Sequence, residues 1–144
     1  MRFCQIKFGS AEYELCLALR QQVLRQPLGL SLSQEDLRGE NQQLHFGLFS
    51  KEQDSLLACL VIHPLTPTTA KLRQMAVVMD SQRQGIGQVL VTETEDFLRR
   101  RGVQTVELHA RTSATGFYEK LGYEPSGPLF NEVSIEHQKM WRQL

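Results

Sequence analysis

The spacing of apolar residues changes twice in the first quarter of the chain. Residues 2–8 alternate weakly between apolar and polar side chains, which predicts a strand. Apolar residues then recur at helical spacing after Ser10, a favoured N-cap residue, and this pattern stops at Pro27 and Gly29. The chain is therefore expected to begin with a strand followed by a helix.

The segment 26–43 carries little periodicity and is rich in polar residues, with a short helix predicted after Ser33. Connections of this length inside a small domain are uncommon and often cover a functional site. A surface loop with its own small apolar cluster explains the segment equally well. The sequence leaves both interpretations open.

Two apolar stretches, residues 44–49 and 56–62, are joined by six polar residues and predict an antiparallel hairpin. A turn-rich break follows, and the next strand is predicted at 71–79. Sequential hairpin connections of this kind predict a mainly antiparallel sheet.

The second half of the chain predicts a long helix over residues 85–101, with one apolar stripe. A strand at 103–110 and a short helix capped by Thr112 or Ser113 come next, and residues 123–141 contain turns and one or two strands. The strand–helix–strand order predicts a βαβ-like unit.

Length and composition fit one globular domain spanning 1–144, of the α/β class (α+β mixed), with helices flanking a central sheet. Sixteen basic residues balance 16 acidic ones, so neither nucleic acid nor a membrane surface is an expected partner. The longest apolar run, 56–62, is far too short for a membrane span, and no signal peptide is recognisable. We therefore expect a cytoplasmic protein.

The three cysteines, Cys4, Cys16 and Cys59, are odd in number and lack metal-ligand spacing. They are expected to be reduced, mostly buried thiols. No metal site is predicted.

The stretch between the strand at 71–79 and the long helix is the best candidate for a binding site. The first turn of a helix has N–H groups without internal partners at the positive end of its dipole. Gly85 and Gly87 remove side chains that would keep an anion away, no acidic residue lies in that turn, and Arg83 adds positive charge. The pattern favours a phosphate site, although a glycine at a helix start can also mark a simple turn.

Two common phosphate-binding motifs do not fit. A P-loop requires Lys after its second glycine, where this chain has Gln88. A dinucleotide-binding fingerprint requires a third glycine or alanine where this chain has Leu90. A nucleotide-binding domain of either class is therefore disfavoured.

Residues 82–87, Gln-Arg-Gln-Gly-Ile-Gly, match the Gln/Arg-x-x-Gly-x-Gly/Ala signature of the GCN5-related N-acetyltransferases (GNAT). Residues 117–123, Phe-Tyr-Glu-Lys-Leu-Gly-Tyr, resemble the second common segment of that family, and the likeness covers about residues 40–144. The closing run from 130 to 140 resembles the ElaA-like subgroup. It departs from that subgroup at Ser134 and Glu136, where Gly and Pro are common.

The resemblance implies acetyl-CoA as cosubstrate, held in a gap where a bulged strand splays from its parallel neighbour. In such enzymes the pantetheine arm pairs with the backbone at positions matching Met75, Ala76 and Val77. The N–H of Val77 would point at the thioester oxygen. The pyrophosphate would lie on N–H groups of the segment Gln82, Arg83, Gln84, Gly85, Ile86 and Gly87.

The resemblance also places Tyr118 near the sulfur of the coenzyme, as a hydrogen-bond donor to the departing thiolate and as a further cofactor contact. An amine acceptor needs a general base. The candidates are Glu107, His109, Glu132 and His137. Core packing for Tyr118 and surface roles for the other residues are the competing interpretations. The chain also departs from the family at Arg111, where many members have Asn.

We therefore expect an N-acetyltransferase that moves the acetyl group of acetyl-CoA directly to a primary amine, in a ternary complex. The acceptor could be a small molecule, a lysine or an N-terminal amine, and the sequence does not distinguish them. The alternative is a non-catalytic acyl-CoA-binding sensor or interaction module of the same fold. Homodimers are common in the family, so a homodimer is possible.

Overall fold

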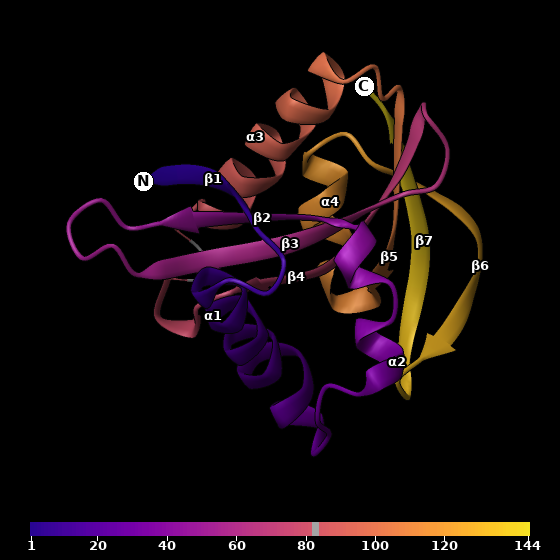
Figure 1. Ribbon diagram of the computed structural model, residues 1–144. Helices are drawn as coiled ribbons and strands as arrows, with labels where there is room; N and C mark the ends of the chain where they lie inside the picture. The colour runs from indigo at the N-terminus through magenta and orange to yellow at the C-terminus, as the bar shows by residue number, and fades with distance from the viewer. Residues whose placement is uncertain (82–83) are drawn as a thin grey trace.

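The computed structural model describes residues 1–81 and 84–144 and contains one seven-stranded sheet, in the order β1-β2-β3-β4-β5-β7-β6 (Figure 1). Neighbouring strands are antiparallel except β4 and β5, which are parallel and joined through α3. The predicted α/β fold with a mostly antiparallel sheet is confirmed. The strands are β1 (Arg2–Ile6), β2 (Leu44–Phe49), β3 (Leu56–Pro64), β4 (Thr69–Val77), β5 (Thr105–Arg111), β6 (Glu124–Glu132) and β7 (Ile135–Gln143).

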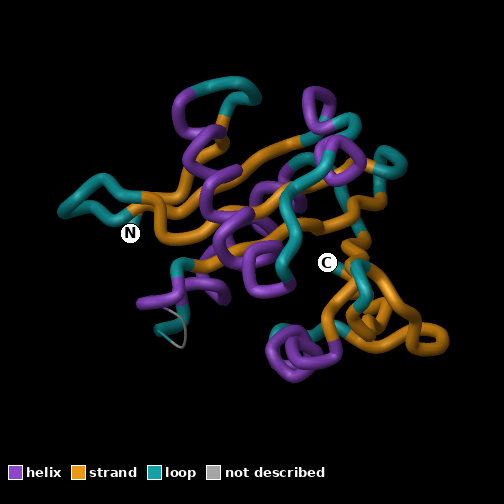
Figure 2. The backbone as a smooth tube through the Cα atoms, turned by 90° about the horizontal axis from the view of Figure 1, so that it is seen from below, coloured by secondary structure: helices purple, strands orange, loops and turns teal. Residues whose placement is uncertain are grey.

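The sheet is strongly twisted. In Figure 1, β2, β3 and β4 run across the view, whereas β5, β7 and β6 run from top to bottom. A quarter turn away, in Figure 2, the first group still lies across the view and the second is seen nearly end-on. The change of direction falls between β4 and β5, which run parallel.

Helices cover both faces of the sheet (Figure 2). The larger apolar core, with Phe46, Leu60, Leu90 and Leu108 at its centre, joins α3 to the sheet. A smaller core lies under α1. The helices are α1 (Ala11–Arg20), α2 (Gln34–Leu37), α3 (Ile86–Arg100) and α4 (Thr115–Lys120). None of the helices in the described ranges is long and apolar enough to cross a membrane.

The helix α1 begins as predicted, because the Ser10 side chain accepts a hydrogen bond from the backbone N–H of Tyr13. The helix then widens into a π-helical turn at Gln21–Arg25, which the sequence did not predict. A short 3-10 turn at Gln26–Leu28 completes it, and Gly29 ends it in a left-handed conformation.

The strand predicted at 71–79 was placed two residues too late, because β4 starts at Thr69 and stops at Val77. A 3-10 turn at Met79–Ser81 follows the strand and replaces the predicted end. The closing segment forms two strands, β6 and β7, which pair as a hairpin.

A β-bulge interrupts β4. Cys59 pairs with Ala76 and Val61 with Arg73, so two residues of β4 oppose one of β3. Gln74, inside the bulge, has a φ of +54°. Because one extra residue turns the following side chains to the other face, Ala76 packs in the core under α1 rather than in the larger core.

The bulge coincides with an opening in the sheet. The parallel pairing of β4 with β5 ends at Leu72 and Leu108, although each strand continues beyond that point. The two strands therefore diverge, as expected from the family resemblance, and leave a gap in the middle of the sheet.

The long connection 26–43 is held by a buried carboxylate. Glu40 has 0% of its surface exposed and accepts hydrogen bonds from Arg20 at 2.7 and 2.8 Å, from Arg73 at 2.7 Å and from Tyr13 at 2.7 Å. These contacts join the connection to α1 and β4. The connection does not itself line the cavity described below, which favours the surface-loop interpretation.

Candidate functional site

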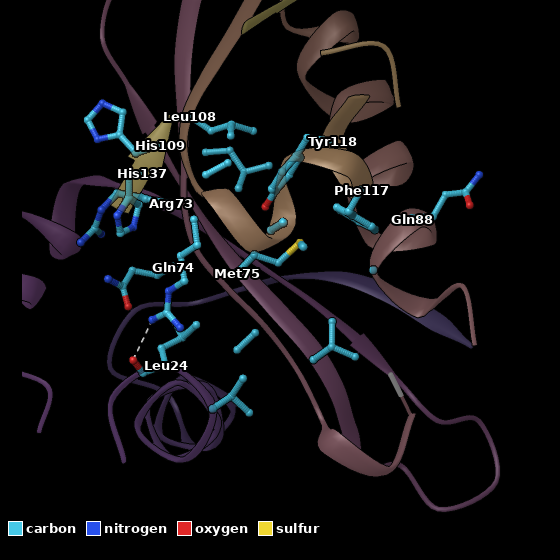
Figure 3. A pocket seen from close by; sticks show the side chains of 18 of the residues that line it. Leu24, Arg73, Gln74, Met75, Gln88, Leu108, His109, Phe117, Tyr118 and His137 are labelled. Atoms are coloured by element: carbon cyan, nitrogen blue, oxygen red, sulfur yellow. Dashed lines mark hydrogen bonds between the residues drawn. The ribbon is translucent and has the colours of Figure 1, made fainter. Parts of the chain in front are cut away.

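The gap between β4 and β5 opens into a cavity of about 780 Å³, within the range of small-molecule sites (Figure 3). One end is formed by the start of α3 and by α4, where Figure 3 shows Gln88, Phe117 and Tyr118. The other end is formed by β5, the β6–β7 hairpin and the π-helical turn, with His109, His137 and Leu24. The cavity therefore joins the predicted anion site at the start of α3 to residues predicted as candidate bases.

The start of α3 supplies backbone groups to the first end. Gly85 is the N-cap, with a φ of +78°, and a Cβ atom added there would meet nothing within 4 Å. Gly85, Ile86 and Gly87 line the cavity, while Gln84 is exposed and does not. No acidic residue lies in the first turn of α3. The predicted contacts Gln82 and Arg83 lie outside the described residues.

Gly87 also has a packing role that the sequence did not indicate. A Cβ atom added to Gly87 would lie 3.2 Å from the ring of Phe117 and 3.6 Å from the side chain of Val77. The missing side chain lets α3 approach α4 and β4 closely. Gly85 therefore leaves open space for an anion, whereas the absence of a side chain at Gly87 is explained by close packing.

The predicted pantetheine-binding residues Met75, Ala76 and Val77 all line the cavity. They follow the bulge on β4, where the strand has left its partner β5. The bulge thus determines which backbone groups of β4 border the gap.

Tyr118 lies at the end of the cavity formed by α3 and α4, with 7% of its surface exposed. Its ring packs edge-on against Phe117 and Tyr123, at centroid distances of 5.0 and 5.7 Å. The hydroxyl points into the cavity (Figure 3) and makes no hydrogen bond within residues 1–81 and 84–144. Burial raises the pKa of the Tyr118 phenol, so the hydroxyl keeps its proton at neutral pH.

Three of the four candidate bases form one cluster at the opposite end. Glu132 Oε1 lies 3.1 Å from His109 Nδ1, and Glu132 Oε2 lies 3.7 Å from His137 Nε2. His137 Nδ1 lies 2.8 Å from the Ile135 carbonyl. Since a carbonyl only accepts, Nδ1 carries the proton and Nε2 is the nitrogen that faces Glu132. The ring of Phe130 packs against both imidazoles.

The β6–β7 turn brings Glu132 to the histidines. Val133 and Ser134 both have positive φ, +46° and +63°, as a tight two-residue hairpin turn requires. A β-branched residue such as Val133 rarely adopts this conformation, and such strain concentrates at functional sites. Glu132 and Val133 both line the cavity.

Glu107, the fourth candidate base, does not join this cluster. Its carboxylate lies 3.7 Å from Lys139 Nζ, and it does not line the cavity. It shares a strand face with His109 but lies one residue pair further from the opening.

The sequence missed the arginines of this end of the cavity. Arg25 and Arg73 both line it. Asp36 binds the Arg25 guanidinium with both oxygens, at 2.8 and 3.2 Å. Burial opposes ionisation of Asp36, but Arg25 and Ser33 outweigh it and lower its pKa to about 2. Arg25 follows a helical apolar stripe, so only the π-helical turn reveals where it points.

Comparisons with known proteins agree with this geometry. Residues 19–144 match the family model described as an acetyltransferase (GNAT) domain. The Bacillus subtilis protein YyaT is 30% identical over 109 residues, covering 69% of this chain and 74% of YyaT.

The chain is also similar to one named N-acetyltransferase in sequence and to one crystal structure in fold. The Escherichia coli ribosomal protein bS18-alanine N-acetyltransferase is 36% identical over 98 residues, covering 66% of this chain and 62% of that enzyme. The crystal structure of Escherichia coli ElaA superposes with a TM-score of 0.81 at 19% identity, covering 98% of each chain. With the family model matched over most of its length, the chain belongs to the GNAT family of acetyltransferases.

Proposed function

We propose that this chain transfers the acetyl group of acetyl-CoA directly to a primary amine, within a ternary complex. One observation carries the proposal. A single cavity through the sheet joins the glycine-rich start of α3 and Tyr118 at one end to the Glu132 cluster at the other.

The residues present fit the coenzyme. Open space at Gly85 gives an anion access to the first turn of α3, where the helix dipole favours negative charge. The backbone of Met75–Val77 borders the gap that would hold an extended arm. When bound, acetyl-CoA supplies an acetyl group activated as a thioester. Gln82 and Arg83 are proposed contacts on the strength of the family signature alone.

The acceptor end supplies a base. An alkylamine with a pKa of about 10.4 is neutral in only about one molecule in 2,500 at pH 7, a handicap of about 4.6 kcal/mol. Glu132, with 47% of its side chain exposed, accepts the proton directly or through one water. His109 Nδ1 lies within hydrogen-bond distance of one Glu132 oxygen and positions the carboxylate, while the other oxygen lies 3.7 Å from His137 Nε2.

Tyr118 acts at the other end of the transfer. Its buried hydroxyl keeps its proton and is available to donate a hydrogen bond to the departing sulfur. None of the three cysteines is among the described residues that line the cavity, so no thiol there can take up the acetyl group. This supports direct transfer over an acetyl-enzyme.

A pair of matched substitutions tests the proposal. Coenzyme A release would be measured across a panel of primary amines, with acetyl-CoA binding followed by isothermal titration. Glu132→Gln is expected to lower turnover by about 10²- to 10⁴-fold, the usual contribution of a general base, with acetyl-CoA binding unchanged. Glu107→Gln, the same change outside the cavity, is expected to retain wild-type turnover.

Two results would contradict the proposal. One is full activity of the Glu132→Gln variant, which would move the base elsewhere. The other is wild-type protein that binds acetyl-CoA but releases no coenzyme A with any amine, as a sensor module would.

A further inference from the structure

Three arginines and two carboxylates lie together where α1, the π-helical turn, the connection 26–43 and β4 meet, next to the cavity. Arg20 and Arg73 share one carboxylate, that of Glu40. Arg25 occupies both oxygens of the other, Asp36. Both carboxylates are therefore already paired with arginines.

Arg111 is a further cation. It is the last residue of β5 and lines the cavity. Its Nη2 donates to the Leu24 carbonyl at 2.9 Å, and Arg25 Nη1 donates to the same oxygen at 3.2 Å. No carboxylate lies within 4 Å of Arg111 in the described parts of the chain. A guanidinium has five N–H donors, so most of those of Arg111 remain for a ligand.

The surroundings of Arg111 favour an anion. Burial and then the neighbouring charge of Arg25 lower the pKa of Arg111, which means that its positive charge is poorly compensated. An incoming carboxylate would match the planar fork of the guanidinium with two parallel hydrogen bonds. A ligand with several positive charges would be repelled here.

Arg111 lies next to His137, the residue whose imidazole faces the proposed base Glu132. It is the register partner of His137 on β7, and paired residues have Cβ atoms about 5 Å apart. Arg111 and Glu132 therefore line the same end of one cavity, which suits a small ligand that carries both an anionic group and an amine. Glu132 complements the ammonium group, and Arg111 complements the anion.

We infer that Arg111 binds the carboxylate of the acceptor, so that the acceptor is a small primary amine bearing a carboxylate, of the amino acid type. This assignment rests on the proposed acetyl transfer. It makes Arg111 a specificity-determining residue, in a role separate from the chemistry at Glu132 and Tyr118.

The experiment compares free amino acids with their carboxamides and with the corresponding decarboxylated amines, by release of coenzyme A. The best amino acid is expected to exceed its carboxamide in kcat/KM by about 10- to 100-fold, the effect of a hydrogen bond to a charged group. Arg111→Gln is expected to remove this preference mainly by raising KM for the acid, and Arg111→Lys to restore part of it. Arg99→Gln, which removes an exposed arginine paired with Asp96, serves as the control and is expected to change nothing.

The outcomes separate the two proposals. Carboxamides or simple amines used as well as the acids, or an Arg111→Gln variant that slows all three alike, would overturn the carboxylate assignment and leave acetyl transfer standing. No release with any amine would overturn both. The wild-type comparison of acid with amide decides the assignment even where a variant fails to fold.

Discussion

Replacing Glu40, which does not itself line the cavity, by Gln should destabilise the protein severely. The carboxylate of Glu40 is fully buried, and the partner Arg20 is 1% exposed. Glutamine keeps the shape and one acceptor oxygen but removes the charge. The substitution therefore leaves the Arg20 guanidinium buried beside a neutral amide.

The pKa of Glu40 sets the size of the effect. Burial opposes ionisation, but hydrogen bonds from Arg20, Tyr13 and Arg73 outweigh it and lower the pKa from 4.5 to about 2. At 1.36 kcal/mol for each pH unit by which folding lowers the pKa, this change corresponds to about 3 kcal/mol of folding free energy at neutral pH. Breaking a buried ion pair from one side typically costs about 3–5 kcal/mol, which agrees.

Thermal unfolding followed by circular dichroism measures the loss. For a chain of this size, about 3 kcal/mol corresponds to a fall in Tm of about 10 °C. Glu35→Gln provides the matched control, because Glu35 is 73% exposed and pairs with the exposed Arg38. Its Tm should stay close to that of the wild type.

The pH dependence of the stabilisation by Glu40 follows from the lowering of its pKa in the folded protein. Because the folded-state pKa lies below the unfolded value, the stabilisation is complete above pH 4.5 and is lost as pH falls from 4.5 toward 2. The gap in Tm between wild type and Glu40→Gln should therefore narrow in that window. A variant that melts within about 2 °C of wild type at pH 7, or a gap that is the same at pH 3, would refute the reasoning.

Two further substitutions test the cofactor end. Tyr118→Phe should lower turnover by about tenfold, since it removes one hydrogen bond to a developing charge, while acetyl-CoA affinity measured by titration stays nearly unchanged; equal turnover would reject the role given to the hydroxyl. Gly87→Ala should lower the unfolding free energy by about 1–3 kcal/mol in a denaturant titration, because the new methyl group presses on Phe117. Gly116→Ala, in α4 with open space around its Cβ, should instead leave stability unchanged or raise it by up to about 1 kcal/mol, and a loss as large as that at Gly87 would argue against the packing explanation.

Much of the fold could be predicted because its elements are regular. The hairpin of β2 and β3 and the long helix α3 each have a clear period and polar boundaries. His109, Glu132 and His137 were selected from strand periodicity and the family resemblance. Their contact with one another depends on a hairpin register that no single-strand pattern specifies.

The parts that could not be predicted depend on exceptions to local preference. Gln74 adopts a positive φ at the bulge, although glutamine carries no preference for that conformation. Glu40 lies in a polar segment and resembles a surface residue. Its carboxylate is nevertheless fully buried and pairs with two arginines. Tertiary contacts outweigh local signals at both positions.

The π-helical turn at Gln21–Arg25 makes one wall of the cavity depend on the length of the first helix. Losing one residue before Leu24 would close this turn into ordinary α geometry, because each i→i+5 hydrogen bond would become an i→i+4 hydrogen bond. The backbone beyond the turn would keep its phase, so Arg25 could still pair with Asp36 and the Leu24 carbonyl could still accept from Arg111. The extra residue of the π-helical turn therefore widens this stretch of the wall locally and leaves the contacts that follow it in place.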